Sequence, residues 1–222
     1  MQSLDIAMTA LFGVGLLQAG WLSVAAVRRG APSSLIIRGV WSLTGIWVLL
    51  WPVYTTPYAL FAAIGLFALT ALLPAFIKAD ACRSLLQAWS DDEPLPWPMW
   101  MFVLALAGSA VQFTYYPEFG FGTALSLCLG LPLAHWWDRS GRMRLSFPAN
   151  PGQTLPGHIS LILTVVICCG WGLNVYQQIG WFESLTATLL AGCAASAARG
   201  LILHPFNVPV VALAIGSVLW LL

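Results

Sequence analysis

The chain has 222 residues, of which 59% are hydrophobic and only 8% are charged, and its formal net charge at pH 7 is +1. Soluble globular proteins carry about a quarter charged residues, and a chain of this length has too little interior to hide so many apolar side chains from water. These figures exclude a soluble enzyme and a disordered chain. The absence of a basic excess also excludes a nucleic-acid-binding protein.

Uncharged apolar stretches recur along the whole sequence, each near the length that crosses a bilayer as a helix. They predict an all-α fold, namely a polytopic helical bundle in a membrane. We expect about eight transmembrane helices, with seven as the alternative, in a single membrane domain covering residues 1–222. The predicted spans are Ile6–Val27, Leu35–Tyr54, Tyr58–Ile77, Trp97–Tyr116, Phe119–Trp137, Ile159–Tyr176, Phe182–Ala198 and Phe206–Leu222.

Basic residues fall in or beside alternate connections between these spans, and this pattern predicts an orientation. Lysine and arginine collect on the cytoplasmic side of membrane proteins, so these connections are expected to be cytoplasmic and both termini non-cytoplasmic. The compactness of the chain favours a bacterial inner membrane. The nine basic residues are Arg28, Arg29, Arg38, Lys78, Arg83, Arg139, Arg142, Arg144 and Arg199.

The connection 78–96 is the first of two predicted cytoplasmic loops that are long enough to hold more than a turn. It contains the acidic run Asp91-Asp92-Glu93. Adjacent carboxylates either hold a divalent cation, which prefers oxygen ligands, or form an ordinary solvated loop. The preceding segment, Ala79–Trp89, alternates apolar and polar residues and predicts a short helix in the membrane interface.

The second cytoplasmic loop, 138–158, combines arginine, glycine and threonine at the membrane surface. Guanidinium groups bind phosphate oxygens through paired N–H groups, and glycine lets the backbone approach a ligand closely. Arg139, Arg142, Arg144 and Thr154 therefore form a candidate cradle for phosphate. The alternative is a positive-inside loop whose arginines contact anionic lipid headgroups.

All three histidines, His135, His158 and His204, lie at span ends on this same side, as does Asp138. Three imidazoles and a carboxylate would suit a transition metal if they converged. Polar residues are also common at span ends, so the pattern alone leaves both interpretations open.

The seventh span is rich in small side chains, which let helix backbones approach closely and predict a buried position in the bundle. The same face could instead bind a partner membrane protein. These residues are Ala191, Gly192, Ala194, Ala195, Ser196, Ala197 and Ala198.

Four segments in the C-terminal half follow one another in the order that a known family shows. They are Leu129-Gly130-Leu131-Pro132-Leu133-Ala134, Arg139-Ser140-Gly141-Arg142, Gln153-Thr154-Leu155-Pro156-Gly157 and His204-Pro205-Phe206-Asn207-Val208-Pro209. This arrangement resembles the signature region of the CTP-dependent polyprenol kinases, which include phytol and dolichol kinases and are distant relatives of phosphatidate cytidylyltransferases. The N-terminal half is similar only in being made of spans.

The charged residues of that family are missing at the matching positions. Leu131 stands where the family has the aspartate of a Gly-Asp pair, Gln153 where it has a lysine, Pro156 where it has a glutamate, and His204-Pro205 where it has an Asp-Asn pair. Asp138 is the one nearby carboxylate that could replace the lost ligands. Phosphoryl transfer depends on metal-assisted charge neutralisation, so the sequence leaves open whether the chain is an enzyme.

The resemblance implies a protein that handles a lipid alcohol, such as a polyprenol or phytol, or a lipid phosphate at the cytoplasmic leaflet. Mg²⁺ and CTP would be its cofactors if catalysis survives, with Asp138 as candidate catalytic residue and metal ligand. The candidates for binding substrate or phosphate are Arg139, Arg142, Arg144, Asn150, Thr154 and Asn207, and further metal candidates are His135, His158 and His204.

Two other functions fit the same sequence. A non-catalytic membrane subunit would have kept the bundle, lost the charged residues and bound a membrane protein partner. A small transporter is the second alternative, although such proteins normally carry an ionisable residue or a broken helix within a span. The expected partners are the lipid bilayer and an isoprenoid or glycerolipid ligand, and no nucleic acid.

Overall fold

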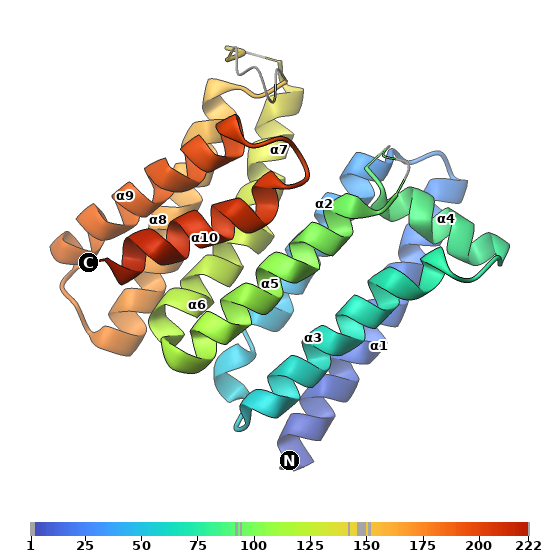
Figure 1. Cartoon of the computed structure of the whole chain (residues 1–222), viewed down its shortest axis with the longest axis horizontal. Coiled ribbons are helices and arrows are strands. Elements are labelled where there is room, and N and C mark those ends of the chain that lie inside the picture. Colours follow the sequence, from blue (N-terminus) through green and yellow to red (C-terminus); the bar gives the residue numbers. More distant parts are fainter. Residues whose placement is uncertain are drawn as a thin grey trace. The chain divides into compact units, whose positions relative to one another are not determined.

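The computed structural model describes residues 3–91, 93, 95–141, 143–145, 150 and 152–221. Within these residues the regular secondary structure is helical, and extended pairing is limited to an isolated bridge between Arg144 and Thr154. Six helical segments are long and apolar enough to cross a membrane (Figure 1). The predicted all-α class is therefore confirmed, and the six segments indicate an integral membrane protein.

Each of the eight predicted spans coincides with a helical segment. The six that meet the length and hydropathy requirement are α1 (Ser3–Arg28), α2 with the following 3₁₀ turn (Ser33–Val53), α3 with its 3₁₀ turn (Pro57–Ala75), α5 (Trp97–Tyr115), the segment Pro117–Arg139, and α8 (Leu155–Gln177).

The last two predicted spans are helices, but they do not meet this requirement. α9 (Trp181–Leu201) is long enough and contains many small and hydroxyl-bearing residues, which lower its hydropathy. α10 (Asn207–Trp220) has 14 residues, which at 1.5 Å per residue span about 21 Å, less than the roughly 30 Å of a bilayer core. The total of eight spans stays a prediction.

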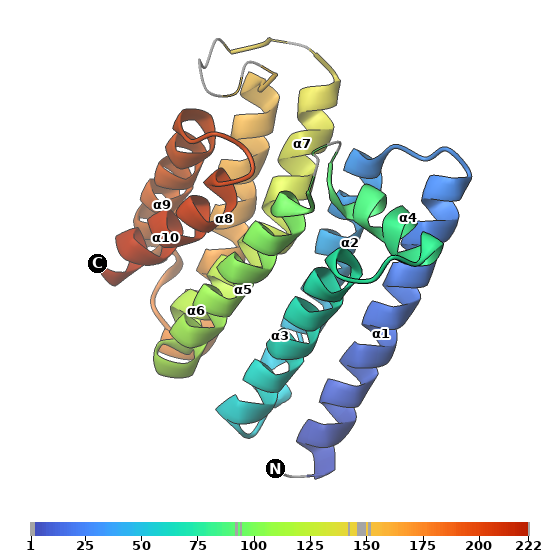
Figure 2. The ribbon, with the colours of Figure 1, turned by 45° about the vertical axis from the view of Figure 1, so that its right-hand side comes forward.

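The chain divides into two compact units, Met1–Leu104 and Ala105–Leu222, and the boundary falls inside α5. In unit 1, α1, α2 and α3 alternate in direction, and α4 (Asp80–Trp89) packs against α1 and α2 where the first connection lies (Figure 2). The short helix expected at Ala79–Trp89 is thus present as α4.

Aromatic rings form much of the core of unit 1, because few other side chains fill so much space between helices. Trp41 stacks on Phe102 with ring centroids 4.5 Å apart, and Phe12 stacks on Trp47 at 4.0 Å.

Near the start of α1 the fully buried Asp5 accepts hydrogen bonds from the backbone N–H of Thr55 and from the hydroxyl groups of Thr55 and Thr56.

Asp91, the first residue of the acidic run 91–93, has a structural role. Asp91 Oδ2 accepts a hydrogen bond of 2.7 Å from Arg38 Nη2, and both side chains are about nine-tenths buried. The Arg38 guanidinium also lies 4.3 Å from the centre of a Trp41 ring. Asp91 is therefore an ion-pair partner that ties this loop to α2, Glu93 is exposed, and Asp92 lies outside the described residues.

In unit 2 the segment Pro117–Arg139 is one continuous rod of three parts. α6 (Pro117–Leu125) passes through a wide π-helical turn, Ser126–Gly130, into α7 (Leu131–Arg139). Pro132 sits at the start of α7, and since proline has no N–H to donate to the carbonyl of Cys128, a regular α-helical turn would lose a hydrogen bond there.

Two glycines let α6 and α8 pack backbone to backbone. A Cβ on Gly122 would lie 2.6 Å from Cys169 Cα, and one on Gly172 would lie 2.7 Å from the carbonyl oxygen of Glu118. Any larger residue at either position would push the helices apart.

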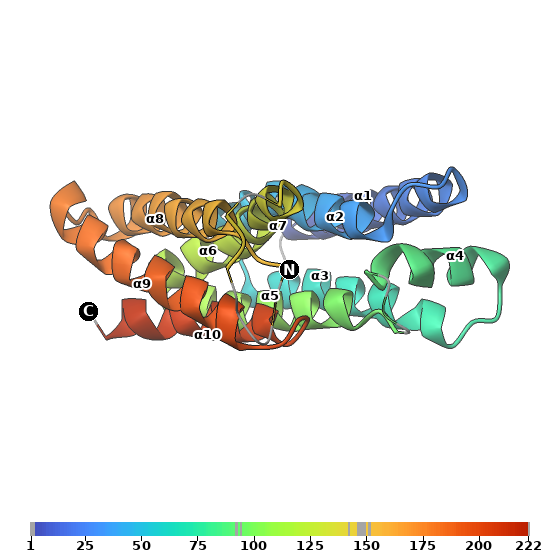
Figure 3. The ribbon, with the colours of Figure 1, turned by 90° about the horizontal axis from the view of Figure 1, so that it is seen from above.

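α9 lies between α8 and α10 (Figure 3). Its small residues Ala191 and Ala195 are fully buried there, and a Cβ on Gly192 would lie 3.1 Å from the carbonyl oxygen of Ile162 in α8. The predicted burial is confirmed for Ala191, Gly192, Ala195 and Ser196, whereas Ala194 and Ala198 are partly buried and Ala197 is exposed. The neighbours that cover the buried side belong to unit 2 itself.

Candidate functional site at the basic end of unit 2

Four helix ends meet at the end of unit 2 that carries Arg139, Arg144 and Arg199, which we call the basic end. α7 ends there, α8 begins, α9 ends and α10 begins (Figure 1). Polar side chains from these ends form one hydrogen-bonded cluster, called the polar network below. Its members are Asp138, Asn150, Gln153, Thr154, His158, Ser196, Arg199 and Asn207.

An ion pair between Asp138 and Arg199 joins the end of α7 to the end of α9. Asp138 Oδ2 accepts a hydrogen bond from Arg199 Nη2, and the two side chains are 10% and 7% exposed respectively. Asp138 Oδ1 accepts two further bonds, of 2.8 Å from the backbone N–H of Thr154 and of 3.1 Å from its hydroxyl group. Both oxygens of the carboxylate are therefore engaged within the protein.

Thr154 connects this ion pair to the start of α8. It is the N-cap of that helix, where its side-chain oxygen accepts a hydrogen bond of 3.2 Å from the N–H of Gly157. A hydroxyl at this position satisfies one of the free N–H groups of the first turn. Gly157 itself is required, because a Cβ there would lie 2.9 Å from the carbonyl oxygen of Ala134 in α7.

A second chain of hydrogen bonds runs through His158, which is 5% exposed. Its Nε2 lies 2.8 Å from Gln153 Oε1 and its Nδ1 lies 2.6 Å from Ser196 Oγ. Gln153 Nε2 in turn donates a bond of 2.9 Å to the carbonyl oxygen of Arg199. The imidazole therefore joins α8 to α9, and both of its ring nitrogens are already bonded.

Asn150 caps the C-terminal end of α9. Its Nδ2 donates to the carbonyl oxygens of Arg199 at 3.0 Å and Ile202 at 2.7 Å, and its Oδ1 accepts a bond of 3.2 Å from the N–H of His204. The last carbonyl groups of a helix have no partner within the helix. The amide of Asn150 supplies one, which holds this residue against the end of α9.

Two buried polar atoms of this network have no hydrogen-bond partner among the described residues, namely Arg199 Nη1 and Asn207 Oδ1. Both residues are 5% exposed. A buried donor or acceptor left without a partner costs about 1–3 kcal/mol, so a bound ligand or an ordered water would be favoured at each. The two atoms offer a ligand one cationic donor, the guanidinium N–H of Arg199, and one neutral acceptor, the amide oxygen of Asn207.

The structure brings together five of the residues singled out from the sequence: Asp138, Asn150, Thr154, His158 and Asn207. Arg139 and Arg144 are exposed, at the end of α7 and beside Thr154 respectively. Arg142 lies outside the described residues.

The histidines do not converge on Asp138 as a metal site would require. His158 is held by Gln153 and Ser196, and His135 and His204 are only partly buried. Across the part of the chain that the structure describes, no group of three or more His, Cys, Asp or Glu side chains lies close enough to hold a metal ion.

Sequence reasoning missed the central role of Arg199 and the contributions of Gln153 and Ser196. Arg199 counted only as one of nine basic residues that predict orientation. One signal in the sequence was available: Arg199 directly follows a predicted span of small residues, and such a helix is expected to lie inside the bundle rather than at its surface.

Leu131, Gln153 and Pro156 stand at three of the positions at which the polyprenol kinases carry a charged residue. Leu131 is buried at the start of α7, seven residues and therefore about 10 Å along the helix from Asp138. Gln153 belongs to the polar network, and Pro156 lies in the first turn of α8.

Comparisons with protein-family models, with curated proteins and with solved structures found no match to this chain. The similarity to the polyprenol kinases therefore stays a prediction from motif order.

Proposed function

We propose that this protein binds a lipid phosphate or lipid alcohol at the cytoplasmic leaflet, with the polar network of unit 2 as the headgroup site, and that it does so without transferring a phosphoryl group. The observation that carries the proposal is the pair of buried, unpartnered atoms Arg199 Nη1 and Asn207 Oδ1. A guanidinium N–H suits a phosphate oxygen, and an amide oxygen accepts a bond from a hydroxyl group.

Two exposed arginines, Arg139 and Arg144, belong to the same basic end. Basic side chains near a membrane surface attract anionic headgroups, each by about 1 kcal/mol. They would therefore raise the local concentration of a phosphate-bearing lipid beside the network. The cytoplasmic orientation rests on the positive-inside pattern of the nine basic residues, and a bacterial inner membrane remains part of this proposal.

The residues around Asp138 do not fit the magnesium and nucleotide that the resembled family would use. Magnesium prefers a set of oxygen ligands, usually including one or two carboxylates. The carboxylate of Asp138 is occupied by Arg199 and Thr154, and the described residues contain no group of three or more His, Cys, Asp or Glu side chains that could hold a metal ion. Binding without transfer is therefore the function that this geometry supports best.

The test is a lipid-binding measurement on the purified protein in detergent, using phosphatidate and a polyprenyl phosphate against phosphatidylcholine. We expect both phosphate monoesters to bind more tightly than phosphatidylcholine. Each of the exchanges Arg139→Gln and Arg144→Gln should weaken phosphatidate binding about fivefold. Glu183→Gln, a charge change at an exposed position in the first turn of α9 and so at the opposite end of that helix from the basic end, is the control and should leave the affinity unchanged. Equal affinity for all three lipids would overturn the proposal.

A transfer assay separates binding from catalysis. The protein is incubated with Mg²⁺ and labelled CTP against a panel of polyprenols, phytol and phosphatidate, so that γ-phosphate and CMP transfer are both visible. We expect no label in any lipid. Label that appears in a lipid and disappears with Asp138→Asn, in protein that is demonstrably folded, would show an enzyme instead.

A further inference from the structure

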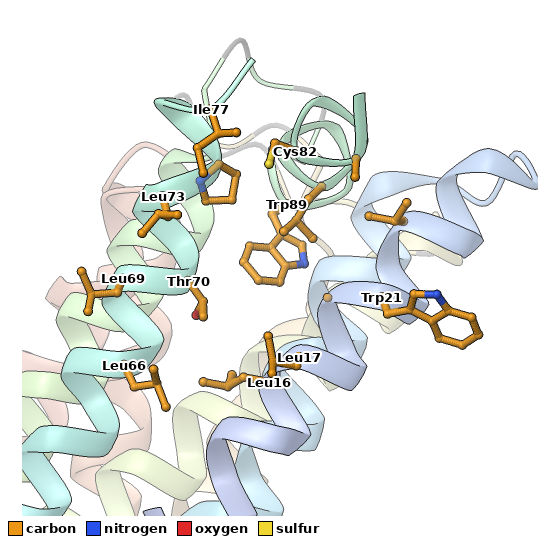
Figure 4. A pocket seen from close by; sticks show the side chains of 15 residues that line it. Leu16, Leu17, Trp21, Leu66, Leu69, Thr70, Leu73, Ile77, Cys82 and Trp89 are labelled. Atoms are coloured by element: carbon orange, nitrogen blue, oxygen red, sulfur yellow. The ribbon is translucent and has the colours of Figure 1, made fainter. Parts of the chain in front are cut away.

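Unit 1 contains an apolar pocket of about 500 Å³ between α1, α3 and α4 (Figure 4). Leu69 and Leu73 come from the α3 side, Leu16 and Leu17 from α1, and Trp89 from α4 lies between the two helices. Among the described residues that line it, only Thr70 carries a hydroxyl group, and that hydroxyl donates to the carbonyl oxygen of Phe67. The lining therefore offers a hydrocarbon surface.

Some of the lining side chains are buried and others are exposed, so the pocket is open on one side. Leu16 and Trp89 are 5% and 2% exposed, whereas Leu17 and Leu69 are 69% and 57% exposed. The Trp89 indole N–H donates a bond of 3.2 Å to Ser23 Oγ, which fixes the ring as a wall between α4 and α1. A cavity of about 150 Å³ lined by apolar side chains is enough to bind benzene in another protein, so this larger pocket has room for part of a lipid chain.

Basic residues follow the lining residues at the end of the pocket where α4 lies. Lys78 comes directly after Ile77, and Arg83 directly after Cys82. Arg28 comes four residues after Val24, which places both on one face of α1. Lys78, Arg83 and Arg28 are exposed. Counting Arg29, the segments Arg28–Arg29 and Lys78–Arg83 together carry four basic residues and one acidic residue, Asp80.

We infer that this pocket binds one hydrocarbon chain of an anionic membrane lipid, whose phosphate lies against Lys78, Arg83 and Arg28. The apolar lining accounts for the chain and the basic rim accounts for the sign of the headgroup. The inference does not rest on the function proposed for unit 2, because every residue in it belongs to unit 1.

Photo-crosslinking tests the inference on the full chain in vesicles of phosphatidylcholine. The probes are phosphatidylglycerol and phosphatidylcholine that carry the same photoreactive group in one acyl chain, each present as a trace. We expect the phosphatidylglycerol probe to label peptides of α1 and α4 that line the pocket, at least about fivefold more than the phosphatidylcholine probe does. The double exchange Lys78→Gln and Arg83→Gln should remove that preference.

Two variants fill the pocket from different helices. Gly20→Leu adds a side chain at a position where a Cβ would meet only Leu85, at 3.9 Å, and Cys82→Phe enlarges a lining residue of α4. Each should reduce the labelling of the pocket peptides at least tenfold. Gly65→Leu is the matched control: Gly65 is exposed on α3, has open space around it and does not line the pocket.

If either filling variant fails to fold, the other decides the result. Labelling that is equal for both probes, or that persists in the folded filling variants, would overturn the inference. It would mean that the pocket holds only the lipids that surround any membrane protein.

Discussion

Asp138 and Arg199 are 61 residues apart in the sequence and form a buried ion pair. A carboxylate at the end of a span near a basic loop could serve as a metal ligand, a general base or an ion-pair partner, and the sequence does not distinguish these roles. The neighbours decide between them. With Arg199 and Thr154 bonded to both of its oxygens, Asp138 acts here as the centre of a structural network.

Removing one member of this pair should destabilise the protein more than removing both. Asp138→Asn leaves the Arg199 guanidinium buried without its counter-charge, and breaking a buried pair in this way costs about 3–5 kcal/mol. We expect both Asp138→Asn and Arg199→Gln to lower the thermal midpoint in detergent, and the double variant to recover part of the loss. A double variant whose loss equals the sum of the two single losses would show that the pair contributes no coupling energy.

The role of Asp5, near the start of α1 in unit 1, likewise depends on its neighbours in the tertiary structure. The sequence places it just before the first predicted span, where a charged residue needs no explanation. In the structure it is fully buried and accepts hydrogen bonds from Thr55 and Thr56. The N-terminal end of α1 is thereby tied to the connection between α2 and α3, a contact that no local pattern announces.

The helices lie where the sequence predicts them, but the neighbours of each helix do not follow from its own sequence, as α9 shows. Its small residues predicted a buried face, and the structure confirms the burial on one side of the helix, at Ala191, Gly192, Ala195 and Ser196, while Ala197 is exposed. The identity of the neighbours was open, since a small-residue face fits an intramolecular helix and a partner protein equally well. The neighbours in the structure are α8 and α10.

Ala195→Leu should therefore disrupt the folding of the single chain. Ala195 is fully buried, and inserting extra methylene groups into a packed site costs about 1–3 kcal/mol. We expect this variant to lose folded monomer in size-exclusion chromatography and to melt earlier. Cys193→Leu on the exposed side of the same helix is the control and should behave as the unmodified protein does. A folded Ala195→Leu monomer that fails to assemble with a co-purifying protein would assign this face to a partner instead.

At the scale of the whole molecule, the alternation of basic connections predicts a topology with both termini on one side. The helices agree with the eight predicted spans in position, although α9 and α10 do not meet the length and hydropathy requirement.

Cysteine labelling in cells measures that orientation. In a background with Cys82→Ser and Cys193→Ala, a cysteine is introduced by Gly180→Cys in the connection after α8 or by Ser140→Cys after α7, both at exposed positions. We expect a membrane-impermeant maleimide added to spheroplasts to label the Gly180→Cys protein and not the Ser140→Cys protein. Inverted vesicles should give the opposite result. Labelling of both from one side would contradict the predicted topology.

The sequence by itself determined the helices, because an apolar segment in hydrocarbon must satisfy its backbone hydrogen bonds internally and a helix does so within one segment. It also brought Asp138, Thr154 and Asn207 to one end of the bundle, because alternate connections lie on the same side. Only the tertiary structure decided which side chains pair there. The partner of Asp138 is set by how the ends of α7 and α9 pack, and packing between helices depends on distant residues such as Gly157 and Ala195 that carry no charge of their own.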